Sequence, residues 1–217
     1  MSYSVSVQKE IDSLFAAHPE LEPQRANILY ALDLLIDCYA HGGKVLICGN
    51  GGSAADSEHI VGELMKGFKK RRPLREGKLE ALKAACPEDW EQVAAGLQDA
   101  LPAISLVSHS ALMTAFLNDV DPAYLYAQQV VGYAKPGDVL IGISTSGNAV
   151  NVCNAFRVAK ALGMSTIGLT GKTGGCFPAL CDAAVIVPAQ ETYAIQELHL
   201  PVYHMLCAAV EAAFFAE

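Results

Sequence analysis

The sequence has no apolar segment long enough to cross a bilayer, and its first residues do not have the pattern expected of a signal peptide. No apolar run reaches the roughly 18 residues that a membrane-spanning helix requires. Residues 1–20 have neither the basic start nor the apolar centre of a signal peptide. The seven cysteines show no CxxC spacing, and their odd number favours free thiols in a reducing compartment. These absences predict a cytoplasmic protein that does not enter a membrane.

Charged residues are also scarce, at 18% of the chain, whereas apolar residues make up 52%. This is the composition of a globular domain rather than of a disordered chain. The net charge of −8 disfavours broad, non-specific binding to nucleic acid. One segment differs, because residues 66–78 (KGFKKRRPLREGK) hold seven of the fifteen basic residues. It is either a solvated turn after a helix or a patch for an anionic ligand or partner, and both interpretations stay open.

Five short segments rich in Val, Ile and Leu are apolar throughout, which is typical of parallel strands covered on both faces. They are residues 44–49, 103–108, 138–144, 165–171 and 183–189. Helical spacing of apolar residues lies between them, so strands and helices alternate with right-handed crossovers. The pattern predicts an α/β fold in which a five-stranded parallel sheet lies between two helical layers. We expect residues 1–217 to form a single domain.

Helical patterns also occur before the first strand, at residues 23–43, and at the end of the chain. The last helix is expected from about Thr192 to Phe215 despite Pro201, and its apolar end is explained by burial either in its own domain or against a neighbouring subunit. Residues 74–101 are interpreted as an insertion of two short amphipathic helices. We hypothesise that this insertion, with its basic approach, acts as a lid or a specificity element.

Two turns that follow predicted strands have the composition of phosphate-binding turns. In Gly49–Ser53 (GNGGS), glycines allow backbone N–H groups to approach an anion, and the helix start adds partial positive charge. Ser144–Asn148 (STSGN) offers three hydroxyls at another helix start. Either turn alone also fits an ordinary helix cap. Neither GxGxxG nor the P-loop pattern is present, so a small phosphorylated metabolite fits better than ATP or NAD.

Two further pairs of residues suggest acid–base or metal chemistry. His59 and Glu63 are four residues apart, so a helix presents both on one face. Gln196 and His204 are eight apart on the last predicted helix. Together these side chains form a ligand set that suits a divalent metal such as zinc. A surface ion pair and a core histidine are the alternatives, because spacing alone does not bring the two helices together.

In their order along the chain, the motifs resemble the sugar isomerase (SIS) domain family, and within it the phosphoheptose isomerase branch. The motifs are CGNGGS, SHSALMTAFLND, GDVLIGISTSGN, TGKTGG and IQELH followed by His204. The similarity runs from about residue 25 to 215, interrupted at 74–101. It implies a flavodoxin-like subunit in a homotetramer with active sites between subunits. It also implies an aldose–ketose isomerase that interconverts sedoheptulose 7-phosphate and D-glycero-manno-heptose 7-phosphate through an enediol.

The resemblance assigns roles to individual residues. The hydroxyl groups that it places on the substrate phosphate are those of Ser53, Ser144, Thr145 and Ser146. Further substrate-binding positions are Asn50, Gly51, Gly52, Asn118, Asp119 and Gln196. The zinc ligands that it implies are His59, Glu63, Gln196 and His204. Glu63 and His204 are also expected to be catalytic, moving protons between C1 and C2.

The chain departs from the family pattern at two short motifs besides the insertion. Ala149 follows STSGN where the family has serine, and Tyr193-Ala194 replaces an Asp-Arg pair whose aspartate is implicated in catalysis. Two alternatives therefore stay open. One is an SIS isomerase for a different sugar phosphate, and the other is a non-catalytic SIS module that binds a protein, like a relative that associates with the replication initiator. Retention of all four metal positions favours the enzyme.

Overall fold

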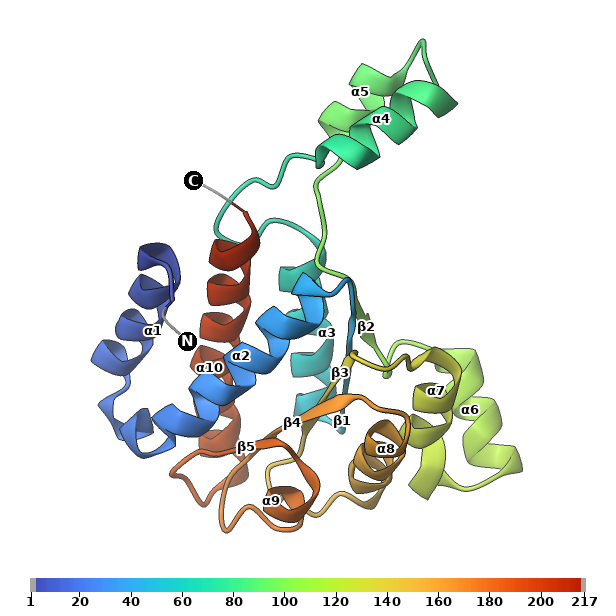
Figure 1. The fold of residues 1–217 in the computed structure, drawn as a ribbon. Coiled ribbons are helices and arrows are strands. Elements are labelled where there is room, and N and C mark those ends of the chain that lie inside the picture. Colours follow the sequence, from blue (N-terminus) through green and yellow to red (C-terminus); the bar gives the residue numbers. More distant parts are fainter. Residues whose placement is uncertain (1–2, 216–217) are drawn as a thin grey trace.

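The computed structural model describes residues 3–215 and shows a parallel sheet between two layers of helices (Figure 1). The strands are β1 (Val45–Gly49), β2 (Ala103–Ser105), β3 (Val139–Ile143), β4 (Ser165–Thr170) and β5 (Ala183–Ile186). Their order is β2-β1-β3-β4-β5, and all neighbouring pairs are parallel. This is the flavodoxin-like order, so the predicted fold class is confirmed. The strands β2 and β5 are shorter than predicted, because apolar residues such as Leu106 and Val187 are buried in the connections instead.

Successive residues of each strand point to opposite faces of the sheet and so belong to two separate cores. Val45 and Ile47 of β1 belong to the first core, whereas Leu46 and Cys48 belong to the second. The first helical layer consists of α1 (Val5–Ala17), η1 (Pro19–Gln24), α2 (Arg25–Ala40), α3 (Gly52–Met65) and α10 (Thr192–Phe214). The second consists of α6 (Ser110–Asp119), η2 (Pro122–Tyr124), α7 (Leu125–Tyr133), α8 (Val150–Ala161) and α9 (Phe177–Leu180).

The last helix, α10, is buried within its own chain. All residues from Met205 to Glu211 are buried, in the layer that α10 shares with α1, α2 and α3. Pro201 lies inside the helix without ending it. Burial in its own domain therefore explains the apolar end of the sequence. No helix formed by residues 3–215 has both the length and the apolar character that a membrane span requires.

The predicted insertion forms a two-helix arm, α4 (Glu76–Ala85) and α5 (Trp90–Gly96), which projects from the end of the body (Figure 1). No residue of either helix is buried. At the base of the arm, the buried Asp99 accepts hydrogen bonds from Lys78 Nζ and from the backbone N–H groups of Arg75 and Ala100. These contacts join the two ends of the arm to each other. The arm itself points away from α3 and α10 (Figure 1). That residues 74–101 are inserted relative to the family, and that they act as a lid, stay predictions.

Removal of the two-helix arm is expected to leave the domain about as stable as before. Four glycines would replace residues 79–96, which retains the contacts of Lys78 and Asp99 at the base. Since neither arm helix has a buried residue, we expect the thermal unfolding midpoint to shift by less than about 3 °C. Differential scanning calorimetry measures this shift. A fall of about 10 °C or more would show that the arm is part of the folded core.

One histidine of α10, His199, is fully buried, and neither of its ring nitrogens has a hydrogen-bond partner within the described chain. Burial lowers the pKa of His199 to about 4 from 6.5, and the adjoining backbone of Thr170 partly opposes the shift. Between these two values the unfolded chain binds a proton that the folded chain does not. The free energy of unfolding therefore falls as the pH drops through this window, by about 3 kcal/mol.

The variant His199→Leu should lose this part of the pH dependence. Urea unfolding at about pH 5 and about pH 7 would give the difference in the free energy of unfolding for each protein. The control is His41→Leu, because the His41 side chain is 74% exposed. If His199→Leu and the parent chain weaken equally at the lower pH, His199 is not the group responsible.

Candidate active site

Two polar turns meet at the carboxyl edge of the sheet. The strands β1 and β3 are neighbours, with Gly49 paired to Ile143 at their carboxyl ends, and the chain leaves them towards opposite edges of the sheet. Ligands of open α/β sheets bind at such a point, where the strand order reverses. The turns Gly49–Ser53 and Ser144–Asn148 begin here. The structure therefore brings together the two turns that resemble phosphate sites.

Asn50 connects the first turn to the helix that follows the second. Its amide donates to Asn151 Oδ1 at 3.0 Å, and the Asn151 amide donates back to Asn50 Oδ1 at 2.9 Å. The Tyr126 hydroxyl donates to the Gly49 carbonyl oxygen at 2.6 Å. Gly51 has a φ of 57°, which favours glycine, and lies immediately before α3. Ser53, in the first turn of α3, is buried.

The second turn is held against the segment that follows β4. A side chain at Gly147 would place its Cβ 2.0 Å from the Gly174 carbonyl oxygen, so only glycine fits there. Ser144 is buried, and Thr145 and Ser146 are half-buried. The residues that precede α3 and α8, Gly51 and Ala149, form no side-chain cap hydrogen bond. At the start of α8, the Val152 N–H donates to Asn151 Oδ1 at 3.0 Å. The partial positive charge of both helix starts still favours an anion.

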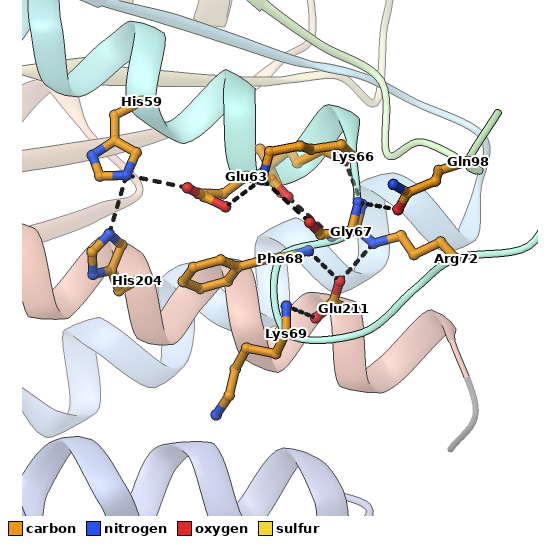
Figure 2. Close-up of polar contacts among 11 residues, drawn as sticks. His59, Glu63, Lys66, Gly67, Phe68, Lys69, Arg72, Gln98, His204 and Glu211 are labelled. Atoms are coloured by element: carbon orange, nitrogen blue, oxygen red, sulfur yellow. Dashed lines mark hydrogen bonds and ion pairs between the residues drawn. The ribbon is translucent and has the colours of Figure 1, made fainter. Parts of the chain in front are cut away.

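The helix α10 packs along α3 and brings the second group of candidate residues together. Gln196 lies against Gly52, where a Cβ atom would be 2.4 Å from Gln196 Nε2. About two turns further along, His59 Nε2 is 3.2 Å from Glu63 Oε1 and 3.4 Å from His204 Nε2 (Figure 2). The sequence spacing left open whether these helices meet, and the structure shows that they do.

Tyr203 and Asp56 extend this group, although the sequence patterns single out neither of them. The Tyr203 hydroxyl is 3.2 Å from Asp56 Oδ1 and 3.0 Å from His59 Nδ1. Burial raises the pKa of the Asp56 carboxyl, and the hydrogen bond from Tyr203 opposes the shift. The available signal was that Asp56 precedes His59 by three residues, on the same face of a helix.

His204 is present mainly in its neutral form at neutral pH. Burial lowers the pKa of the His204 imidazole below 6.5, and the neighbouring His59 adds to the effect. Neutral imidazole is the form that accepts a proton or binds a metal. His204 is thus suited to either of the roles that the resemblance implies.

The donor atoms suit a divalent metal in kind and in pairwise spacing. Tetrahedral zinc with ligand distances of about 2.0–2.2 Å places neighbouring donor atoms about 3.3–3.5 Å apart. The separations of His59 Nε2 from Glu63 and His204, 3.2 Å and 3.4 Å, are similar. Across residues 3–215, however, no three His, Cys, Asp or Glu side chains already surround a common point. Binding would require Glu63 or His204 to turn further towards a shared position.

A buried ion pair holds the end of α3 against α10 (Figure 2). Arg72 Nε donates to Glu211 Oε1 at 2.7 Å, and both side chains are almost completely buried. The same guanidinium donates to the carbonyl oxygens of Leu64 and Glu63, at 2.6 Å and 3.0 Å. Glu211 also accepts two backbone N–H groups, at residues 68 and 69. Arg72 therefore matches neither interpretation of the basic segment, a solvated turn or a patch for an anionic ligand or partner. It is buried and holds the helix end that carries Glu63.

Other sequence-predicted positions lie apart from these groups within one chain. Asn118 and Asp119 are exposed at the end of α6 and are hydrogen-bonded to each other at 2.8 Å. Among residues 3–215, they form no hydrogen bond with the turns or with the histidine group. Tyr193, which stands where the family has aspartate, is 66% exposed in the first turn of α10. Its side chain therefore does not fill the space between α3 and α10.

Comparison with known proteins agrees with this geometry. The model of the SIS domain family matches residues 11–94 and 94–171. The phosphoheptose isomerase of a Nitratiruptor species is 40% identical over 193 residues, covering 89% of each chain. That of Burkholderia pseudomallei (strain 1710b) is 37% identical and covers all of this chain and 97% of the relative. The solved phosphoheptose isomerase of Neisseria gonorrhoeae has a TM-score of 0.72 at 30% identity, covering 95% of this chain and 97% of that one.

The chain therefore belongs to the SIS domain family of α/β proteins. Within this family it groups with the phosphoheptose isomerases, as the motifs predict, and it is an enzyme of that aldose–ketose isomerase type.

The variant Arg72→Met should lower the free energy of unfolding by about 3–5 kcal/mol, because it leaves the Glu211 charge buried without its cationic partner. The matched control is Arg157→Met on the exposed face of α8, where Arg157 contacts Asn154. The control should change the free energy by less than about 0.5 kcal/mol. Urea unfolding measures both. A similar small effect for the two variants would show that the ion pair does not constrain α3.

Proposed function

We propose that this enzyme interconverts sedoheptulose 7-phosphate and D-glycero-manno-heptose 7-phosphate through an enediol. The observation that carries the proposal is the contact of α3 with α10, which groups His59, Glu63 and His204. The helix α3 starts at one phosphate turn and carries His59 six residues after Ser53. The helical rise puts about 9 Å between these two positions. One phosphorylated sugar chain can therefore contact both groups.

In this proposal, the two turns bind the phosphate. The hydroxyl groups that bind it are those of Ser53, Ser144, Thr145 and Ser146. Asn50, Gly51 and Gly52 shape the first turn, and the starts of α3 and α8 supply partial positive charge in place of a lysine. Phosphate binding at a distance from the reacting carbons orients those carbons towards the acid–base groups.

Glu63 and His204 are the proposed catalytic residues. Moving a carbonyl between C1 and C2 requires a base that removes the proton next to it and an acid that serves the oxygen. The Glu63 carboxylate side chain is only 13% exposed, and it lies beside His59. Neutral His204 accepts a proton on the other side of His59. The proton removed from one carbon is returned to the neighbouring carbon, so the reaction needs no external oxidant or reductant.

Zinc is the proposed cofactor, and its proposed ligands are His59, Glu63, Gln196 and His204. A divalent cation, when bound, polarises the substrate oxygen and stabilises the negative charge of the enediolate. The support is the donor set itself, with two imidazoles, a carboxylate and an amide on facing sides of α3 and α10.

A homotetramer with sites between subunits is the proposed assembly. The helix α6 has no buried residue although its sequence, SALMTAFLND, is largely apolar. Leu112, Leu117 and Val120 are exposed there, and such a face is typical of an interface. Asn118 and Asp119, at the end of α6, would then contact substrate in a neighbouring subunit. We also propose a cytoplasmic location, which the seven free cysteines support.

A second candidate is isomerisation of a different sugar phosphate. The observation that favours it is Tyr193, which replaces an acidic residue of the family at the start of α10. A pocket without this carboxylate offers one charged group fewer to the sugar. The non-catalytic protein-binding module has no such support, because the three charged or imidazole groups are retained and lie together.

The decisive experiment measures metal content and turnover of sedoheptulose 7-phosphate in the parent chain and in Glu63→Gln and His204→Gln. We expect bound zinc in the parent and a loss of turnover of about 10²–10⁴-fold in each variant. The control is Glu58→Gln, an exposed carboxylate of α3 that contacts Ser108. It should retain the parental rate.

The other outcomes separate the candidates. Bound zinc without turnover of this substrate would favour a different sugar phosphate. A parent chain with neither metal nor turnover would refute the isomerase and favour the protein-binding module.

A further inference from the structure

The Tyr203 hydroxyl lies between the carboxyl group of Asp56 and the imidazole ring of His59. The side chain is buried, with 2% of the residue exposed. Its oxygen is 3.2 Å from Asp56 Oδ1 and 3.0 Å from His59 Nδ1. The His59 and Tyr203 rings also pack edge to face, with centroids 5.5 Å apart and planes at 74°. These contacts restrict the orientation of His59 from two sides.

The hydrogen-bonding capacities of Asp56, Tyr203 and His59 determine which group donates and which accepts in this chain of hydrogen bonds. A tyrosine hydroxyl has one proton to donate, and a carboxylate can only accept. The Tyr203 proton therefore belongs to Asp56, whose other oxygen, Oδ2, is buried and has no partner within residues 3–215. The Tyr203 oxygen is then left to accept from His59 Nδ1. A neutral imidazole that donates from Nδ1 has its lone pair on Nε2.

We propose that Tyr203 and Asp56 are positioning residues that hold His59 with its proton on Nδ1 and its Nε2 lone pair towards Glu63 and His204. The lone pair faces a carboxylate oxygen 3.2 Å away and a second imidazole nitrogen 3.4 Å away. The lone pair and the Glu63 carboxylate oxygen are both acceptors, and they repel each other unless a cation lies between them. The two hydrogen bonds thus orient His59 as a metal ligand. That the bound group is a metal rests on the proposed function.

This arrangement corresponds to the outer hydrogen bonds of metal-binding histidines. Such histidines donate their second ring N–H to a neighbouring group, which fixes the tautomer and the ring orientation, and loss of that group weakens metal binding about 10–100-fold. Here the acceptor is a tyrosine, which is itself oriented by a carboxylate one helical turn before His59 on α3. The sequence patterns point to neither residue, because Tyr203 becomes a neighbour of α3 only in the fold.

Nitrogen NMR of the metal-free protein tests the direction of the chain without any activity measurement. Long-range ¹H–¹⁵N spectra at neutral pH should show His59 protonated at Nδ1 and unprotonated at Nε2, with the signals assigned by their loss in His59→Gln. In Tyr203→Phe, His59 should become a mixture of tautomers. The control is Tyr39→Phe, another buried tyrosine, which donates to the Pro102 carbonyl oxygen. It should leave the His59 signals unchanged. A proton on Nε2 in the parent, or no change in Tyr203→Phe, would overturn the proposal.

Zinc affinity provides the second readout. Competition with a colorimetric chelator should show binding weakened about 10–100-fold in Tyr203→Phe and Asp56→Ala, with Tyr39→Phe unchanged. Circular dichroism would verify that each variant is folded. Parental zinc affinity in both variants would refute the positioning role and leave the isomerase intact. If the parent binds no zinc and turns over no heptose phosphate, the proposed function fails instead, and the NMR result still decides whether the hydrogen-bonded chain exists.

Discussion

The packing of α10 against α3 is the interaction on which the candidate site depends. His59 and His204 are 145 residues apart in sequence, and their ring nitrogens approach only because these two helices lie side by side. In the loop that follows α3, Arg72 is buried against Glu211 of α10, and each side chain forms three hydrogen bonds. Burying such a pair costs desolvation free energy. We interpret it as a device that specifies how the helices align rather than as a large net source of stability.

The helix α3 also explains why binding and chemistry belong to one site. It begins at the glycine turn that follows β1, next to the serine turn that follows β3, and continues past His59 to Glu63. A single rigid element therefore sets the distance between the phosphate and the reacting carbons. The hydroxyl of Tyr203 adds a constraint across the interface, because it contacts Asp56 and His59 on α3 from its own position on α10. The two helices are thus held together both by packing and by hydrogen bonds between their polar side chains.

The departures from the family pattern lie outside the contact between the polar side chains of α3 and α10. Tyr193 is exposed, and Ala149, directly after the second turn, lacks the hydroxyl group of the family's serine. The two-helix arm leaves the loop that Arg72 anchors, yet its base is closed by Asp99 and its helices contact mainly each other. The groups that face one another between α3 and α10 are unaltered by these changes. A difference in substrate preference is therefore compatible with an intact reaction centre.

Sequence alone determined the sheet, its parallel strands and the two polar turns, because uniformly apolar strands and glycine-rich turns are local signals. It also identified His59, Glu63, Gln196 and His204 as candidates through their spacing on helices and their resemblance to a family. Only the tertiary structure decided that these residues meet, that Arg72 is buried and that α10 is covered by its own chain. It alone revealed Tyr203 and Asp56 as neighbours of His59. The physical reason is that helical periodicity specifies which face a residue occupies, whereas the partner of that face is set by the packing of distant segments.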